Sequence, residues 1–132
     1  MPKPIEYEAS TGEVRAVYDD IRATRKTDFI NNFWKVIAHH PSTLSRIWDS
    51  LKRVMVRPSS IDPLTKEMIY IAVSVTNNCQ YCIASHGAAA RAKGLTDEQF
   101  GELLDIVGLA NETNRLAIGW QVEVDEAFRQ DA

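Results

Sequence analysis

The sequence contains no long apolar run. Its longest apolar-rich stretch, residues 68–75, is far shorter than the roughly 20 residues of a membrane-spanning helix. The chain begins Met-Pro-Lys-Pro and has no apolar segment like that of a signal peptide. We therefore expect a cytoplasmic protein that does not associate with a membrane.

An excess of positive charge is also missing. The chain has 15 Lys and Arg against 18 Asp and Glu, a formal net charge of -3. This balance provides no basic surface for nucleic acid or anionic lipid, so we expect no nucleic-acid partner. A chain of 132 residues is long enough for one hydrophobic core and too short for two, and we expect a single domain over residues 1–132.

Strand signals are absent as well, because no segment alternates convincingly between apolar and polar residues and no Asn-Gly hairpin occurs. Helical periodicity occurs along most of the chain, so the predicted fold class is all-α, a single-domain bundle of about six to seven helices. The expected helices cover residues 10–24, 29–38, 41–55, 62–76, 79–93 and 96–107, with a last one from about 112.

Several residues predict where these helices begin and end. The expected signals are capping-box spacings at Ser10–Glu13 and Thr96–Gln99, Asp62 with Pro63 as N-cap and first turn, Asn78 as the N-cap of the next helix, and a terminating Gly94. The helix over 62–76 is apolar on most faces and is expected to be central and mostly buried. Core packing adequately explains Trp34, Trp48 and Trp120.

Cysteine is scarce, and both copies lie together in Cys79-Gln-Tyr-Cys82. On a helix, Cys79, Cys82 and His86 stand at i, i+3 and i+7, which places them on one face. The amide groups and dipole of a first turn favour thiolate over thiol there, and the two sulfurs can close a small disulfide. We favour a redox pair over two packed thiols. A zinc site is the other interpretation, with His39 or His40 as a fourth ligand.

Two further residues are candidates for proton transfer. Glu67 lies inside the apolar helix, either at a solvated edge or facing the cysteine turn, where burial would raise the pKa of its carboxyl group. His86 is either an ordinary hydrogen-bonded histidine or, on the cysteine face, a functional one. His39 and His40 are better explained as a helix C-terminus than as a ligand pair.

With these residues in view, the sequence resembles the alkylhydroperoxidase D-like (AhpD-like) branch of the carboxymuconolactone decarboxylase family. The matching residues are Lys66-Glu67, Ala72-Val73-Ser74, Asn78-Cys79-Gln80-Tyr81-Cys82, His86, Ala90 and Gly94, with His40-Pro41, Leu44 and Trp48 upstream. The resemblance covers residues 33–94 most closely. The combination of Glu, Cys-x-x-Cys and His at these spacings carries it, and the Cys-x-x-Cys alone would not.

The resemblance implies an all-helical protein that assembles into trimers or hexamers and reduces small organic hydroperoxides. It implies a lipoylated or thioredoxin-like dithiol protein as the reductant, and no cofactor is expected. By position, Cys82 would attack the peroxide, Cys79 would resolve it, and Glu67 and His86 would relay protons. The dipole argument alone would instead make Cys79 the more acidic thiol.

One departure from the family pattern stands in the motif itself. The founding members have a histidine before the second cysteine, where this chain has Tyr81, a possible relay group that is a poor base near neutral pH. Two other enzyme classes stay open. They are a cysteine-independent decarboxylase or lactone-processing enzyme of the same fold, and a general disulfide oxidoreductase.

Overall fold

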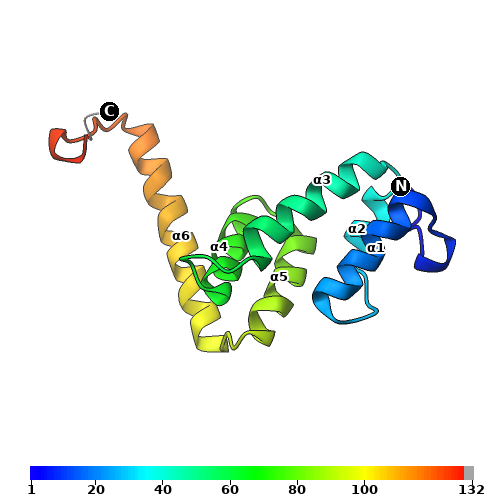
Figure 1. Ribbon diagram of the computed structural model, residues 1–132. Coiled ribbons are helices and arrows are strands. Elements are labelled where there is room, and N and C mark those ends of the chain that lie inside the picture. Colours follow the sequence, from blue (N-terminus) through cyan, green and yellow to red (C-terminus); the bar gives the residue numbers. More distant parts are fainter. Residues whose placement is uncertain (130–132) are drawn as a thin grey trace. The chain divides into compact units, whose positions relative to one another are not determined.

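The described part of the chain, residues 1–129, consists of helices and their connections in the computed structural model, with no strand in that range. The all-α prediction is confirmed (Figure 1). The chain divides into two compact units, Met1–Arg57 and the part that begins at Pro58. The single domain over residues 1–132 stays a prediction.

The first unit contains α1 (Gly12–Arg25), α2 (Asn32–Ile37) and α3 (Pro41–Leu51), which continues into a π-helical turn at Lys52–Val56. Its core consists of Val14, Tyr18, Ile21, Ile30, Trp34, Ala38, Leu44 and Trp48. Trp34 and Trp48 are buried and meet edge to face, with ring centroids 5.3 Å apart. The core positions predicted for these two tryptophans are confirmed.

The start of α1 differs from the prediction. Thr11 is the N-cap and caps with no side-chain hydrogen bond, so the capping box of Ser10 and Glu13 does not form. The Ser10 hydroxyl donates to the carbonyl of Tyr7 and accepts from Arg15 Nε instead. These bonds connect the N-terminal arm to α1, and they engage the Ser10 hydroxyl that would otherwise cap the helix.

The second unit contains α4 (Pro63–Thr76), α5 (Gln80–Ala92) and α6 (Asp97–Gly119). Asp62 caps α4 by accepting the Thr65 amide at 3.1 Å, and Thr96 and Gln99 form the predicted capping box of α6. The core consists of Ile71, Ala90, Leu95, Leu103 and Val107, with Leu64, Met68, Ala72, Val75 and Phe100 packed around it. Two of the predicted helix starts are therefore confirmed.

The residues on α4 are not buried as the sequence predicted. Glu67, Ile71 and Ser74 are buried, whereas Ile69 is 51% and Val73 54% exposed. The mostly buried helix is therefore a wrong prediction, because α4 packs against α5 and α6 with a face that includes its one glutamate. The rest of its apolar surface stays open.

α6 is one helix of 23 residues, where the sequence predicted two with a break at 108–111. A glycine and an asparagine weaken a helix by roughly 1 kcal/mol or less each without ending it. Asn111 also bonds within the structure, since its Nδ2 donates to the Val107 carbonyl and to Thr76 Oγ1 of α4.

Beyond Asn111, α6 leaves the other two helices (Figure 1), and every residue from 112 to 129 is exposed. Trp120, predicted to be in the core, is 80% exposed. Over residues 1–129, none of the helices has both the length and the apolar character needed to cross a membrane.

Candidate functional site

The turn between α4 and α5 positions the two cysteines. Asn78 adopts the left-handed conformation with φ of 58° and donates to the Val75 carbonyl, while the Cys79 amide donates to Ser74 O at 2.9 Å. This pair of bonds is the Schellman ending of a helix, in which asparagine tolerates the left-handed position. Asn78 therefore ends α4, and the prediction that it caps α5 is wrong.

Cys79 itself is the N-cap of α5. Its Sγ accepts the amide of Cys82 at 3.3 Å, and the two cysteines are joined by a disulfide with their Cα atoms 5.3 Å apart. Both residues are half-buried. The predicted location of both sulfurs at the start of this helix is confirmed, and the described structure is the oxidised form of the pair.

Glu67 and His86 are brought together from α4 and α5. His86 Nδ1 lies 2.7 Å from Glu67 Oε2, and their side chains are only 16% and 9% exposed. His86 follows Cys82 by four residues on α5, one helical turn along the same face. Glu67 therefore faces the cysteine helix, and the solvated-edge alternative is excluded.

The protonation of Glu67 differs from the prediction. Burial raises the pKa of its carboxyl group, but the hydrogen bond and charge of His86, together with the Lys93 ammonium, outweigh burial and hold the pKa below its ordinary value. An ionised carboxylate only accepts hydrogen bonds, so His86 Nδ1 carries a hydrogen and donates it. In the neutral ring the lone pair is then on Nε2, where it can act as a base.

Two residues of this cluster were missed in the sequence. Tyr70, one turn after Glu67 on α4, stacks on the His86 ring with centroids 3.6 Å apart and planes 22° apart. Lys93, the C-cap of α5, places its Nζ 3.4 Å from Glu67 Oε1. A helix-face comparison would have found Tyr70, which is three residues from Glu67. Nothing in the sequence connects Lys93 with Glu67, 26 residues away.

The remaining candidates from the sequence are Tyr81, His39 and His40. Tyr81 lies between the cysteines in the first turn of α5 and is 45% exposed. His39 and His40 belong to the first unit, where His39 Nε2 is 2.7 Å from the Lys3 carbonyl and His40 caps α3. His40 thus begins one helix, where the sequence predicted that it ends another.

The zinc interpretation finds no support in the geometry of residues 1–129. No three His, Cys, Asp or Glu side chains of that range converge as metal ligands would. The two cysteines are bonded to each other.

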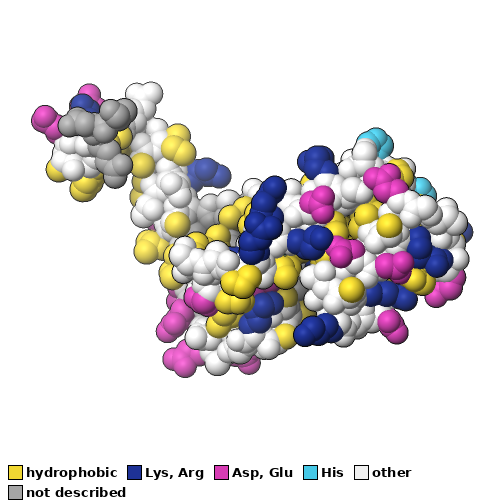
Figure 2. All heavy atoms as spheres, in the orientation of Figure 1, with side chains coloured by type: hydrophobic (Ala, Val, Ile, Leu, Met, Phe, Trp, Pro, Cys, Tyr) yellow, Lys and Arg dark blue, Asp and Glu magenta, His cyan; other side chains and the backbone are white. Residues whose placement is uncertain are grey.

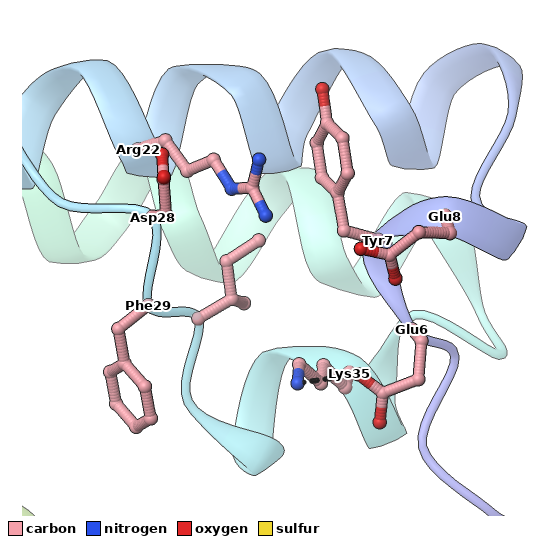
Figure 3. A pocket seen from close by; sticks show the side chains of 8 residues that line it. Glu6, Tyr7, Glu8, Arg22, Asp28, Phe29 and Lys35 are labelled. Atoms are coloured by element: carbon pink, nitrogen blue, oxygen red, sulfur yellow. Dashed lines mark hydrogen bonds and ion pairs between the residues drawn. The ribbon is translucent and has the colours of Figure 1, made fainter.

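The first unit, which contains neither cysteine, has a cavity of about 210 Å³ (Figure 3). Figure 3 shows the Arg22 side chain extending from beside Asp28 toward Tyr7, and Lys35 paired with Glu6. The Arg22 guanidinium stacks on the Tyr7 ring at 3.6 Å. The lining therefore holds charges of both signs and no nucleophilic sulfur, and the chemistry points to the α4–α5 turn instead.

One solved structure resembles the chain over most of its length, and one further relative resembles less than half of it. The crystal structure of the alkylhydroperoxidase AhpD core from Rhodospirillum rubrum is 56% identical, covers 90% of this chain and 88% of its own, and superposes with a TM-score of 0.86. Uncharacterized protein 4 in the cox locus of Paracoccus denitrificans is 34% identical over 55 residues, which are 42% of this chain and half of that protein. The chain therefore spans about half the length of that relative.

A family match agrees with the structural one. Residues 42–131 match the carboxymuconolactone decarboxylase family. This range includes Glu67, both cysteines and His86. Because the match covers more than half of the chain, the protein belongs to the carboxymuconolactone decarboxylase family, with an AhpD-like fold.

Proposed function

We propose that this protein is a thiol-dependent peroxidase that reduces small organic hydroperoxides. The observation that carries the proposal is the disulfide at the start of α5, followed one turn later by a histidine whose Nδ1 is bound to a buried carboxylate. A reversible dithiol beside a positioned base is what peroxide reduction by cysteine requires. The similarity to an alkylhydroperoxidase core supports the same chemistry.

The cycle starts from the reduced pair. His86 Nε2 takes the proton of the Cys82 thiol, and the thiolate attacks the distal peroxide oxygen, which breaks the O–O bond. The sulfur becomes a sulfenic acid, and the released alkoxide takes a proton to leave as an alcohol. Cys79 then displaces the sulfenic oxygen as water, and the disulfide seen in the structure forms. Two electrons from the two thiols thus reduce one hydroperoxide.

Glu67 acts through His86 in this proposal. Its carboxylate accepts the Nδ1 hydrogen at 2.7 Å, keeps Nε2 free as the base, and stabilises the imidazolium that forms when the thiol proton is taken. Tyr81, beside Cys82 and nearly half exposed, can donate a hydrogen bond to the departing oxygen. It would do so from the position where the founding members of the family have a histidine.

The assignment of roles to the two sulfurs can be tested separately. Cys79 Sγ accepts the Cys82 amide, and such a bond stabilises a thiolate and makes Cys79 a good leaving group when the disulfide is reduced. This suits the resolving role of Cys79. Labelling of Cys79→Ser and Cys82→Ser with a sulfenate probe after peroxide treatment should mark only the variant that keeps Cys82, and labelling only of the variant that keeps Cys79 reverses the roles.

Reduction of the disulfide needs a dithiol, and we propose a lipoylated or thioredoxin-like protein as the source. The supporting feature is the partial exposure of both cysteines at a helix start, where an incoming thiolate can reach a sulfur. The exchange passes through a mixed disulfide and returns both cysteines to the thiol form. Turnover of peroxide with reduced thioredoxin or with dihydrolipoamide would identify the class of reductant.

The first test is the reaction of the fully reduced protein with tert-butyl hydroperoxide in a stopped-flow instrument. Loss of both thiols, with a mass decrease of about two hydrogens and one alcohol released per protein, is the expected result. Unchanged thiols in excess peroxide would refute the peroxidase. Lactone turnover that persists in the Cys79→Ser/Cys82→Ser variant would then favour a decarboxylase-type enzyme. Oxidation of protein dithiols without any reaction with hydroperoxide would favour a disulfide oxidoreductase.

We also propose that the protein is a homo-oligomer, a trimer or a hexamer, in which a second copy covers the end of α6. Residues 112–129 are all exposed and include Leu116, Ile118, Trp120, Val122, Val124 and Phe128. Figure 2 shows hydrophobic side chains along this segment. In proteins most helical stability comes from the packing of an apolar face, and the exposed α4 face of Ile69 and Val73 is a matching apolar surface.

The assembly is tested by sedimentation of the full chain. The double variant Leu116→Ser/Trp120→Ser should dissociate the oligomer. Thr113→Ala, which replaces an exposed polar residue of α6, should not. A wild-type chain that sediments as a monomer at all concentrations would refute the proposal.

A further inference from the structure

Lys93 belongs to the proton-transfer cluster although it is far from the cysteines in sequence. It is the last residue associated with α5, and its backbone amide donates to the Ala89 and Ala90 carbonyls. Gly94 follows with φ of 101° and Leu95 returns to the core by donating to Ala90 O at 3.0 Å. This Schellman ending holds the Lys93 backbone in one place, so the side chain can reach across to α4.

The carboxylate of Glu67 divides its two oxygens between two partners. Oε2 is bound to His86 Nδ1 at 2.7 Å, and Oε1 faces Lys93 Nζ at 3.4 Å. Among residues 1–129 these are the ion pairs of Glu67, one with α5 and one with the C-cap residue of α5. On its own helix, Tyr70 stacks on His86. From α6, the part in contact with α4 contributes Leu103 and Val107 to the core, both apolar.

The geometry points to Lys93 as a positioning residue that fixes how Glu67 presents itself to His86. This inference rests on the proposed peroxidase and deepens it. With Oε1 occupied by the ammonium group, the carboxylate cannot rotate without losing an ion pair, so Oε2 stays on Nδ1 and the base stays on Nε2. The positive charge also offsets the burial of a glutamate that is 9% exposed.

Lys93 does this without touching the reacting atoms. Its side chain is 39% exposed, and its ammonium group donates a hydrogen bond to Glu67. Solvent screens a half-exposed charge, so the effect of Lys93 on the Glu67 pKa should be modest. A carboxylate that loses a nearby cation binds a proton more readily, so removal of Lys93 should raise the pKa of Glu67. Without Lys93 the acid limb of the reaction should move to higher pH.

The test compares Lys93→Met with Lys93→Arg and with Arg91→Met. Arg91 is the matched control, since it lies two residues earlier on α5, carries the same charge and pairs with the exposed Asp97 instead of Glu67. The rate of thiol loss with tert-butyl hydroperoxide is followed between about pH 3.5 and 8, a range that contains the ordinary pKa of a glutamate carboxyl group. We expect Lys93→Met to shift the acid limb upward by about half to one pH unit, with little change above it. Lys93→Arg and Arg91→Met should follow the wild-type curve.

A second readout does not depend on peroxide. The Glu67 carboxyl carbon and both His86 ring nitrogens are followed by NMR during a pH titration of the reduced protein. Lys93→Met should raise the titration midpoint of Glu67 and weaken the preference for hydrogen on Nδ1, and Arg91→Met should do neither. If Glu67 and His86 titrate in Lys93→Met as they do in the wild type, the positioning role of Lys93 is refuted, regardless of the result with peroxide. A wild-type protein that is inert to peroxide instead refutes the proposed function.

Discussion

Replacement of Glu67 by glutamine removes one charge from the site and keeps the size of the side chain. The Glu67–His86 contact is 2.7 Å long, and the two side chains are 9% and 16% exposed, so solvent screens it little. A hydrogen bond to a charged group is worth about 1.5–3 kcal/mol. If the full amount is lost in the transition state, the rate of thiol oxidation falls about 10- to 150-fold.

The glutamine also changes which hydrogen-bonding groups His86 meets. An amide can donate as well as accept, so Nδ1 no longer has to carry the hydrogen, and part of the population would have its lone pair turned away from the thiol. This effect adds to the loss of charge and acts in the same direction. The upper part of the range is therefore expected for Glu67→Gln near pH 7.

The assay is the stopped-flow reaction of reduced protein with tert-butyl hydroperoxide, with thiols counted at each time point. Glu102→Gln is the matched control, because this glutamate is exposed on α6 and undergoes the same chemical change. Circular dichroism and thermal unfolding show whether each variant is folded. A folded Glu67→Gln variant that reacts within a factor of about three of the wild type would refute the role of Glu67.

Two other predictions concern stability. Ile71 is completely buried where α4 meets α5 and α6, so Ile71→Ala should cost about 2–5 kcal/mol in urea unfolding. Ile106→Ala, at a position of α6 that is 68% exposed, should cost clearly less. Glu67 has a lowered pKa in the folded protein, so its contribution is present above the ordinary pKa of glutamate and is lost as pH falls through the folded value. The free energy of unfolding should therefore decrease on acidification below about pH 5, and less steeply in Glu67→Gln.

Local signals in the sequence predicted much of the fold. Asp62 with Pro63 and the box of Thr96 with Gln99 define helix starts through bonds within four residues, and both are formed. The predictions failed where other hydrogen bonds, local or tertiary, involved the same side chains. Ser10 was drawn away by Tyr7 and Arg15, and the break predicted near Asn111 was bridged by its bond to Thr76 of α4.

The chemistry of the site was predictable in kind because its nucleophiles and base lie within eight residues of one another. Cys79, Cys82 and His86 share one helix, so their spacing alone places them on one face. The sequence pattern did not decide whether Glu67, 19 residues before the histidine, faces solvent or the cysteine helix. Only the packing of α4 on α5 decided that Glu67 points toward His86.

The sequence by itself determined the helical class, the redox-capable cysteine pair and the histidine beside it, because each depends on residues a few positions apart. The tertiary structure decided the ionisation of Glu67, where the charges of His86 and Lys93 outweigh burial and reverse the direction expected from an apolar segment. It also decided that Tyr70 and Lys93 belong to the site. The reason is physical, since burial and electrostatic interactions depend on distances through space that chain spacing does not give.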